Sequence, residues 1–165
     1  MRIFLIGYMG SGKSTLGKAL AKNLKYRFVD LDKHIEKSYG KTISQIFETK
    51  GEQAFREIEK DYLHKTIDME NTIISTGGGT PCFFENMDWM NEKGITIYIK
   101  MTVDGLFNRL INGKEERPLL QKLDAEEMKE FIHNSLSKRE PFYLKARHVI
   151  KGENVKPKQI ISLLN

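Results

Sequence analysis

The residues with the clearest chemical meaning form a glycine-rich segment at positions 7–15, Gly-Tyr-Met-Gly-Ser-Gly-Lys-Ser-Thr. The segment fits the pattern Gly-x-x-x-x-Gly-Lys-Ser/Thr, follows an apolar β-prone run and precedes a helical pattern. Glycines let backbone N–H groups close around phosphate oxygens, and the positive end of the following helix faces the same anion. Lys13 would reach the β- and γ-phosphates of a nucleotide, and the Ser14 hydroxyl would be a ligand of Mg²⁺. The residues expected to line this phosphate-binding loop are Gly10, Ser11, Gly12, Lys13, Ser14 and Thr15.

A phosphate-binding loop alone does not separate a switch GTPase, an ATPase and a small-molecule kinase. A GTPase would need Asp-x-x-Gly after a later strand and Asn-Lys-x-Asp to read guanine, and the sequence contains neither motif. The residues that could face the transferred phosphate must therefore decide the class.

Two aspartates stand at the end of the second β-prone run, in Phe28-Val29-Asp30-Leu31-Asp32. Carboxylates at the carboxyl end of a strand can serve a metal ion and an acceptor hydroxyl together, one holding Mg²⁺ through its water and the other accepting a proton. The alternative is that Asp32 caps a helix through His34 and Ile35 while Asp30 faces solvent. The spacing leaves both interpretations open.

Three consecutive glycines, Gly77-Gly78-Gly79, follow the third β-prone run. Such a run costs backbone entropy, so we expect either a tight turn or a closely approaching ligand to compensate. A plain loop is the alternative.

Arg56 lies on a helical pattern, with Glu52 four residues before it and Glu59 three residues after it. It is either a partner in a surface ion pair or a guanidinium, oriented by Glu59, that binds a substrate carboxylate.

Two more arginines lie near the C-terminal half of the chain. Arg117 falls in the polar segment 113–120, Gly-Lys-Glu-Glu-Arg-Pro-Leu-Leu. That segment is either a lid whose arginine stabilises charge on the transferring phosphoryl group or an ordinary surface loop. Arg139 is expected to end a helix just ahead of Pro141, where a cation meets the helix dipole favourably.

The elements that must position these residues alternate between strand and helix. The strand candidates are residues 2–6, 26–30, 72–75, 95–100 and 148–151, and the helical patterns are residues 13–24, 51–67, 103–111, 124–138 and a last helix from 157. This alternation predicts an α/β fold with a parallel sheet and right-handed crossovers. Ligands on such sheets gather at the carboxyl ends of the strands, where the candidate residues stand.

The composition predicts an ordinary globular chain. With 165 residues, 39% of them hydrophobic and 30% charged, we expect one domain spanning residues 1–165. Cys82 is the only cysteine, which excludes an intramolecular disulfide and argues against a cysteine-based zinc site. The first apolar run, residues 3–6, is too short for a signal peptide or a membrane span, so we expect a cytoplasmic protein without a membrane partner.

The net charge of +5 is concentrated between residues 145 and 158, where five basic residues face Glu153 alone. A basic segment can bind nucleic acid, but these positions are not interleaved with aromatic residues. We therefore interpret the segment as a solvated surface near an anionic ligand and expect no nucleic-acid partner.

Together, six motifs resemble those of shikimate kinases, in the same order and over nearly the whole chain. They are the phosphate-binding loop at 7–15, the paired aspartates, Phe55-Arg56 with Glu59, the triple glycine, Arg117-Pro118-Leu119-Leu120, and Arg139 with Pro141, Tyr143 and Ala146. Each motif after the first is weak alone, but six in this order are specific.

The resemblance implies an enzyme that transfers the γ-phosphate of ATP to the 3-hydroxyl of shikimate, in the route to chorismate and aromatic amino acids. It implies that Asp32 binds this hydroxyl and that Arg56 and Arg139 bind the carboxylate. The backbone of the triple glycine, Gly78 above all, would also contact the substrate. Mg²⁺ would be bound by Ser14 and, through water, by Asp30. Lys13 and Arg117 would contact the phosphates, and Arg109 would lie against adenine.

The same resemblance implies a three-layer P-loop kinase fold, with a five-stranded parallel sheet in the order 2-3-1-4-5 and a mobile lid. The phosphate-binding core would comprise about residues 1–30 and 70–111, the substrate region about 31–65 and the lid about 112–124. The segment 151–154, Lys-Gly-Glu-Asn, departs from the usual adenine-contacting loop of that family, so we assign no base contact there. We expect a monomer.

Three alternatives share the phosphate-binding loop. A gluconate kinase would not be expected to carry both the triple glycine and Arg117-Pro118-Leu119-Leu120. A nucleoside monophosphate kinase would be longer and would need a base pocket that the sequence does not reveal. A module that senses ATP without turnover would not need Lys13, Asp32 and Arg117 together.

Overall fold

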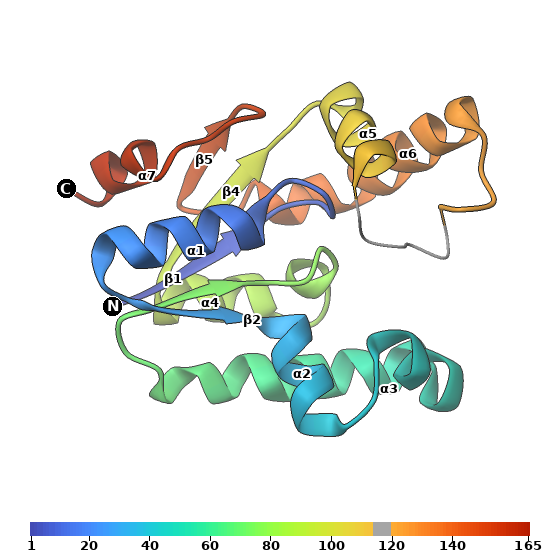
Figure 1. Cartoon of the computed structure of the whole chain (residues 1–165). Helices are drawn as coiled ribbons and strands as arrows, with labels where there is room; N and C mark the ends of the chain where they lie inside the picture. Colours follow the sequence, from blue (N-terminus) through green and yellow to red (C-terminus); the bar gives the residue numbers. More distant parts are fainter. Residues whose placement is uncertain (114–119) are drawn as a thin grey trace.

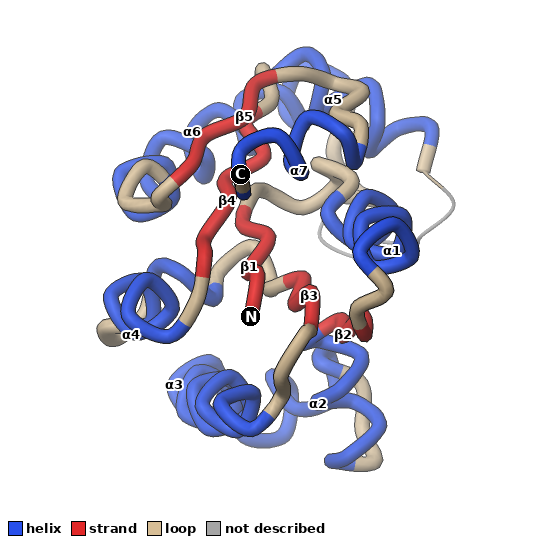
Figure 2. The backbone as a smooth tube through the Cα atoms, turned by 90° about the vertical axis from the view of Figure 1, so that its left-hand side faces the viewer, coloured by secondary structure: helices blue, strands red, loops and turns tan. Residues whose placement is uncertain are grey.

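The computed structural model describes residues 1–113 and 120–165. Five parallel strands form one sheet in the order β2-β3-β1-β4-β5, and helices cover both of its faces (Figures 1 and 2). The strands are β1 (Arg2–Ile6), β2 (Arg27–Asp30), β3 (Thr72–Ser75), β4 (Ile95–Lys100) and β5 (His148–Lys151). The α-helices are α1 (Lys13–Leu24), α2 (Leu31–Tyr39), α3 (Ile43–Lys65), α4 (Asn86–Lys93), α5 (Val103–Asn112), α6 (Ala125–Tyr143) and α7 (Pro157–Leu164). The three-layer fold and the strand order confirm the expectation from the sequence.

The central strands are apolar on both sides because helices bury both faces of the sheet. On one face, Ile3, Leu5 and Ile97 pack against α1 and α7. On the other, Phe4 and Ile6 pack with the buried side chains of α3, α4 and α6. Alternate residues of β1 thus belong to different apolar clusters, and the strand that carries the phosphate-binding loop lies in the middle of the sheet, between β3 and β4 (Figure 2).

The strand register brings three loops to one edge of the sheet. Leu5 on β1 pairs with Ser75 on β3, and Ser75 also pairs with Asp30 on β2. The chain therefore leaves all three strands at the same level. The loops that follow β1, β2 and β3 carry most of the residues singled out by the sequence.

Several helices differ from the prediction. Helix α3 begins at Ile43 and bends at Gly51, whose backbone is not helical (φ 83°, ψ 170°), so the predicted segment from residue 51 is only its second part. Helix α4 was not predicted, and α6 continues through Pro141 to Tyr143 instead of ending near Arg139. Pro141 is tolerated because it lies in the last turn, where Leu144 N–H still donates to Glu140 O (2.9 Å). Among the helices formed by the described residues, none has both the length and the apolar character to cross a membrane.

Phe4 tests the importance of the enclosed central strand. Its side chain is fully buried, and its ring meets the Trp89 ring of α4 edge-on, with centroids 6.0 Å apart. We expect Phe4→Leu to lower the free energy of unfolding by about 1–2 kcal/mol, through the cavity and the lost ring contact. The matched control, Phe84→Leu, makes the same change at a side chain that is 47% exposed and should cost about 0.5 kcal/mol or less. Urea denaturation measures both, and equal losses would contradict the packing described.

Candidate active site

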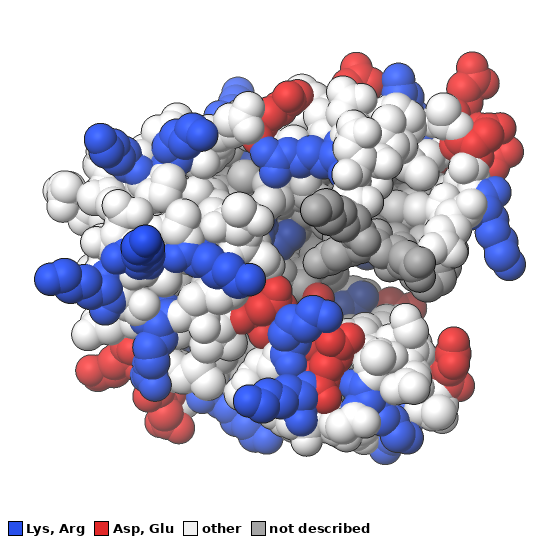
Figure 3. Space-filling model, in the orientation of Figure 1, with Lys and Arg blue, Asp and Glu red and all other residues white. Residues whose placement is uncertain are grey.

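A cleft of about 630 Å³ opens at the edge of the sheet where β1, β2 and β3 end. The phosphate-binding loop forms one side of it, and the start of α2 and the loop after β3 form the other. Figure 3 shows acidic and basic side chains intermixed on this face of the molecule, over α2 and its corner with α3. The cleft residues that the sequence had singled out are Gly10, Gly12, Lys13, Ser14, Thr15, Asp30, Asp32, Gly77, Gly78 and Arg109.

The phosphate-binding loop is shaped by two glycines in the left-handed region, Gly10 (φ 79°) and Gly12 (φ 86°). Helix α1 begins directly after Gly12, so the positive end of its dipole points into the cleft. Lys13 is buried, and its Nζ donates to the carbonyl oxygens of Gly7 (2.8 Å) and Tyr8 (2.9 Å). The loop therefore holds its own lysine at the place where an anion would be cradled.

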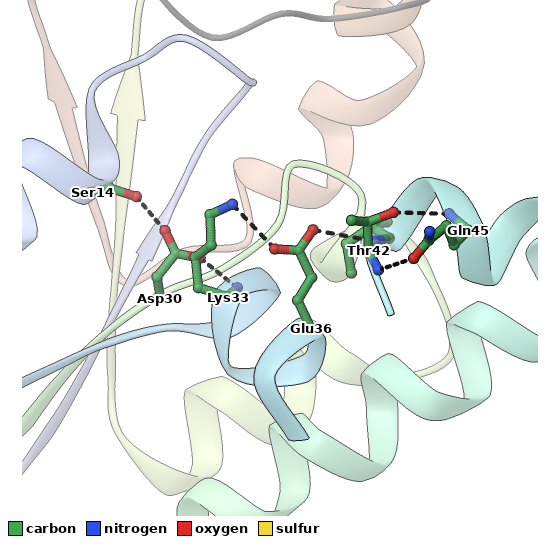
Figure 4. A network of polar contacts seen from close by, with 7 residues as sticks. Ser14, Asp30, Lys33, Glu36, Thr42 and Gln45 are labelled. Atoms are coloured by element: carbon green, nitrogen blue, oxygen red, sulfur yellow. Dashed lines mark hydrogen bonds and ion pairs between the residues drawn. The ribbon is translucent and has the colours of Figure 1, made fainter. Parts of the chain in front are cut away.

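Asp30 joins the phosphate-binding loop to helix α2. One of its carboxylate oxygens accepts a hydrogen bond from Lys33 N–H (3.2 Å), which caps the helix, and the other accepts from Ser14 Oγ (2.7 Å) (Figure 4). The cap that the sequence alternative gave to Asp32 is therefore made by Asp30. Ser75 Oγ lies 3.3 Å from Ser14 Oγ. Sequence reasoning missed Ser75, although its place at the end of β3, just before the triple glycine, was an available signal.

The same polar network extends along the corner between α2 and α3 (Figure 4). Lys33 Nζ pairs with one oxygen of Glu36 (3.1 Å), and the other oxygen accepts from Ile43 N–H (3.2 Å) at the start of α3. Thr42 and Gln45 then cap α3 reciprocally, each side chain accepting from the other's backbone N–H. These contacts fix the wall of the cleft opposite the phosphate-binding loop.

Asp32 lies in the first turn of α2 and lines the cleft. Burial of its carboxyl group, reinforced by the charges of Glu59 and Asp30, raises its pKa from 3.8 to about 6, although Lys13 acts in the opposite direction. This carboxyl is therefore a better proton acceptor than an exposed aspartate.

Charged side chains crowd the triple glycine closely. A Cβ on Gly77 would lie 3.0 Å from Asp32 Oδ1, and one on Gly79 would lie 2.5 Å from Arg56 Nη2. A Cβ on Gly78 would lie 3.2 Å from Arg139 Nη1. The three glycines lie in a turn that a hydrogen bond from Thr80 N–H to Gly77 O closes (3.2 Å). None of them has a positive φ, so the turn itself does not demand glycine, and the close approach of side chains is the stronger reason for these residues. An aspartate and two arginines, from α2, α3 and α6, thus converge on one short loop.

Arg56 makes the i, i+4 ion pair with the exposed Glu52, but its main partner is a buried carboxylate. It is 8% exposed, and its Nη1 donates to Glu59 Oε1 (2.9 Å), a carboxylate that is 1% exposed. Its Cζ lies 4.1 Å from the centre of the Phe83 ring. Glu52 Oε1 is 3.7 Å from Nε, too far for a hydrogen bond, and Nε is a buried donor without a hydrogen-bond acceptor among the described residues. A buried guanidinium with an N–H to spare is suited to an anionic ligand.

Arg139 approaches the same loop from the other side. Its guanidinium lies over the Tyr8 ring, 5.7 Å from the centre, and beside Gly78. One turn further along α6, the Tyr143 hydroxyl donates to the carbonyl oxygen of Gly78 (2.5 Å). Helix α6 therefore holds the loop and presents a cation to it.

A second cavity of about 310 Å³ lies beside the phosphate-binding loop, between the start of α1 and residues 152–157 after β5. Arg109 borders both this cavity and the main cleft, and its guanidinium donates to the backbone oxygen of Glu153. No base contact was expected for residues 151–154, although Gly152, Glu153 and Asn154 line this cavity and their place after the last strand was a signal. Arg117 lies outside the described residues, together with the rest of segment 114–119 of the expected lid at about 112–124.

A phosphate-binding loop after the central strand, a cavity for the rest of a nucleotide and a polar cleft for an acceptor define a P-loop kinase of small molecules. The family model for shikimate kinase matches residues 9–164. The chain belongs to the shikimate kinase family, whose members are ATP-dependent kinases.

Individual relatives agree with this assignment. The chain is 48% identical to the shikimate kinase of Phocaeicola vulgatus over 97% of its own length and 91% of that protein, and 51% identical to that of Parabacteroides distasonis over 93% and 89%. The crystal structure of the Bacteroides thetaiotaomicron shikimate kinase superposes with a TM-score of 0.96 at 42% identity, covering 99% of this chain and 98% of that one. The Acinetobacter baumannii enzyme, solved in complex with shikimate, gives 0.88 at 32% identity, covering 99% and 92%.

Cys82 lies close enough to Arg56 and Arg139 for their charges to act on its thiol, so its reactivity tests how well this part of the site is shielded from solvent. Burial raises the pKa of its thiol from 9.0 to about 11, against the opposing effect of Arg139 and Arg56. At pH 8 the reactive thiolate is then about a hundredfold scarcer, and the higher nucleophilicity of such a thiolate offsets about tenfold of that. We expect iodoacetamide to alkylate the folded protein at least tenfold more slowly than the urea-unfolded chain. Equal rates would contradict the burial described.

Proposed function

We propose that the chain binds MgATP along the phosphate-binding loop and transfers its γ-phosphoryl group to the 3-hydroxyl of shikimate, giving shikimate 3-phosphate and ADP. The observation that carries this proposal is the convergence of Arg56, Arg139 and Asp32 on the triple glycine, beside the part of the cleft that Asp32, Gly77 and Gly78 line. A molecule with one carboxylate and several hydroxyls matches two guanidinium groups, one carboxyl and an accessible backbone.

In the proposed complex, Arg56 and Arg139 bind the carboxylate of shikimate. The Nε–H of Arg56 supports this role, because it has no hydrogen-bond acceptor among the described residues and a substrate carboxylate would supply one. The backbone of Gly77, Gly78 and Gly79 forms the floor on which the substrate ring lies. Glycine at these positions keeps the arginines and the aspartate within reach of the same small molecule.

The proposed transfer uses Asp32 to hold the 3-hydroxyl. The hydroxyl oxygen forms a bond to the γ-phosphorus, and the bond between that phosphorus and the β,γ-bridging oxygen breaks, with its electron pair leaving on ADP. The proton of the hydroxyl passes to the Asp32 carboxylate. Lys13 compensates the charge of the β- and γ-phosphates, and Arg117 is proposed to do the same from the lid.

The donor atoms beside the phosphate-binding loop fit a hard divalent cation. All three groups would coordinate the ion through oxygen: the Ser14 hydroxyl, the Ser75 hydroxyl and the Asp30 carboxylate. The Ser75 hydroxyl and the Asp30 carboxylate both lie within hydrogen-bonding distance of Ser14 Oγ. We propose that Ser14 holds Mg²⁺ directly and that Asp30 does so through water. The bound ion would neutralise phosphate charge.

The adenine is proposed to lie in the cavity between Arg109 and residues 152–157, whose walls include Leu16, Ile99 and Val155. We also propose that the protein acts as a monomer in the cytoplasm, without a nucleic-acid or membrane partner. The support for this proposal is that one chain supplies every side chain named for binding and transfer.

Arg56→Ala tests the carboxylate assignment. We expect the dissociation constant for shikimate to rise about a hundredfold, because a charge-assisted contact to a buried group is lost, while that for ATP changes less than twofold. Isothermal titration measures both constants. Arg27→Ala, at an exposed arginine where β2 begins, should change neither. Comparable losses for both ligands would assign Arg56 a structural role instead.

Asp32→Asn tests the role of the carboxyl group in transfer. The amide can still hydrogen-bond the hydroxyl but cannot take its proton, so we expect kcat to fall by about a thousandfold. The variant should melt cooperatively, as followed by circular dichroism, which shows that folding is retained. Asp61→Asn, at an exposed position on α3, is the matched control. Near-normal turnover would remove Asp32 from the transfer step.

A further inference from the structure

Glu59, the partner of Arg56, is held by two different donors. Its Oε1 accepts from Arg56 Nη1 (2.9 Å), and its Oε2 accepts from the hydroxyl of Thr80 (2.8 Å). Both carboxylate oxygens are thus engaged inside the protein, where an unpaired one would be costly. The orientation of the carboxylate, and through it that of the guanidinium, depends on both donors.

Thr80 is itself fixed by its surroundings. It is fully buried at the start of a short 3₁₀ helix (Thr80–Cys82), directly after the triple glycine. Its N–H donates to Gly77 O (3.2 Å), and its carbonyl oxygen accepts from the buried Asn86 side chain (2.9 Å) at the start of α4. The backbone of Thr80 is therefore fixed by hydrogen bonds at both its N–H and its carbonyl group, and this fixes the direction of the hydroxyl.

The Thr80 hydroxyl lies near the carboxyl groups of both Asp32 and Glu59, beside the triple glycine where the acceptor is proposed to bind. A Cβ added to Gly77 would lie 3.0 Å from Thr80 Oγ1, 3.0 Å from Asp32 Oδ1 and 3.2 Å from Glu59 Oε2. Two carboxyl groups this close repel each other when both are charged. A donor that holds Glu59 Oε2 in place keeps its charge directed to the Arg56 side of the loop.

We infer that Thr80 is a positioning residue for acceptor binding, which orients Arg56 through the Glu59 carboxylate. The inference rests on the proposed binding of the shikimate carboxylate by Arg56. Thr80 lies outside the six motifs that identify the family, and its part is defined by the hydrogen bonds of its hydroxyl and backbone. Loss of the hydroxyl would leave Glu59 free to turn, and the guanidinium would lose its fixed direction.

The test compares Thr80→Val, which keeps the shape and removes the donor, with Thr80→Ser, which keeps the donor. We expect Thr80→Val to raise the KM for shikimate about tenfold, with the KM for ATP changed less than twofold. Thr80→Ser should restore the KM for shikimate to within about twofold of the wild-type value. If the valine variant does not fold, Thr80→Ala removes the same donor without placing a methyl group against Glu59.

Thr66→Val is the matched control. Thr66 is equally buried, and its hydroxyl donates to a backbone oxygen at the end of α3, far along the helix from Arg56. It should lose stability without a change in either KM. An unchanged KM for shikimate in Thr80→Val, an equal rise for both substrates, or failure of serine to restore binding would overturn the inference. A wild-type protein that does not phosphorylate shikimate would instead refute the proposed function itself.

Discussion

The register of the parallel strands is the constraint on which the site depends. Leu5, Ser75 and Asp30 lie level across β1, β3 and β2, so the loops that carry the phosphate-binding lysine, the triple glycine and the paired aspartates start from the same line. A shift of one residue would turn each side chain of a strand to the opposite face and move Asp30 or Ser75 out of line with the loop after β1. Because helices cover both faces, the apolar residues of β1 and β4 hold this register firmly. The fold thus fixes the site through its core.

The acceptor end of the site contains charged groups whose burial does little for stability. Desolvation of Arg56 and Glu59 offsets most of their mutual attraction, and the nearby Asp32 is made harder to ionise. The two apolar clusters stabilise the fold, while the buried charges give direction to a guanidinium and a carboxyl group. Polar positions of this kind are expected where binding outweighs stability.

Local patterns were enough to predict the phosphate-binding loop and the five strands, whereas the order of the strands was implied by the resemblance to shikimate kinases. They were not enough where the cause lies far away in the sequence. The choice between Asp30 and Asp32 as the helix cap depends on how β2 ends against Ser14, and α6 passes Pro141 because Tyr143 is buried against Gly78. The triple glycine suggested a turn or a ligand; the turn is present, but the side chains from three helices that crowd it could not be foreseen. Ser75, Thr80 and residues 152–157 carry no motif of their own, and their position just after or at the end of a strand was the only signal in the sequence for Ser75 and for residues 152–157.

The account is tested most directly by the release of ADP from MgATP, measured with the full chain and with shikimate, gluconate, AMP or no acceptor. The arrangement of Arg56, Arg139 and Asp32 predicts release that depends on shikimate alone, since gluconate has no ring and AMP has no carboxylate to place against the two arginines. Release that depends on gluconate or AMP, or no release from folded protein that binds ATP, would contradict it.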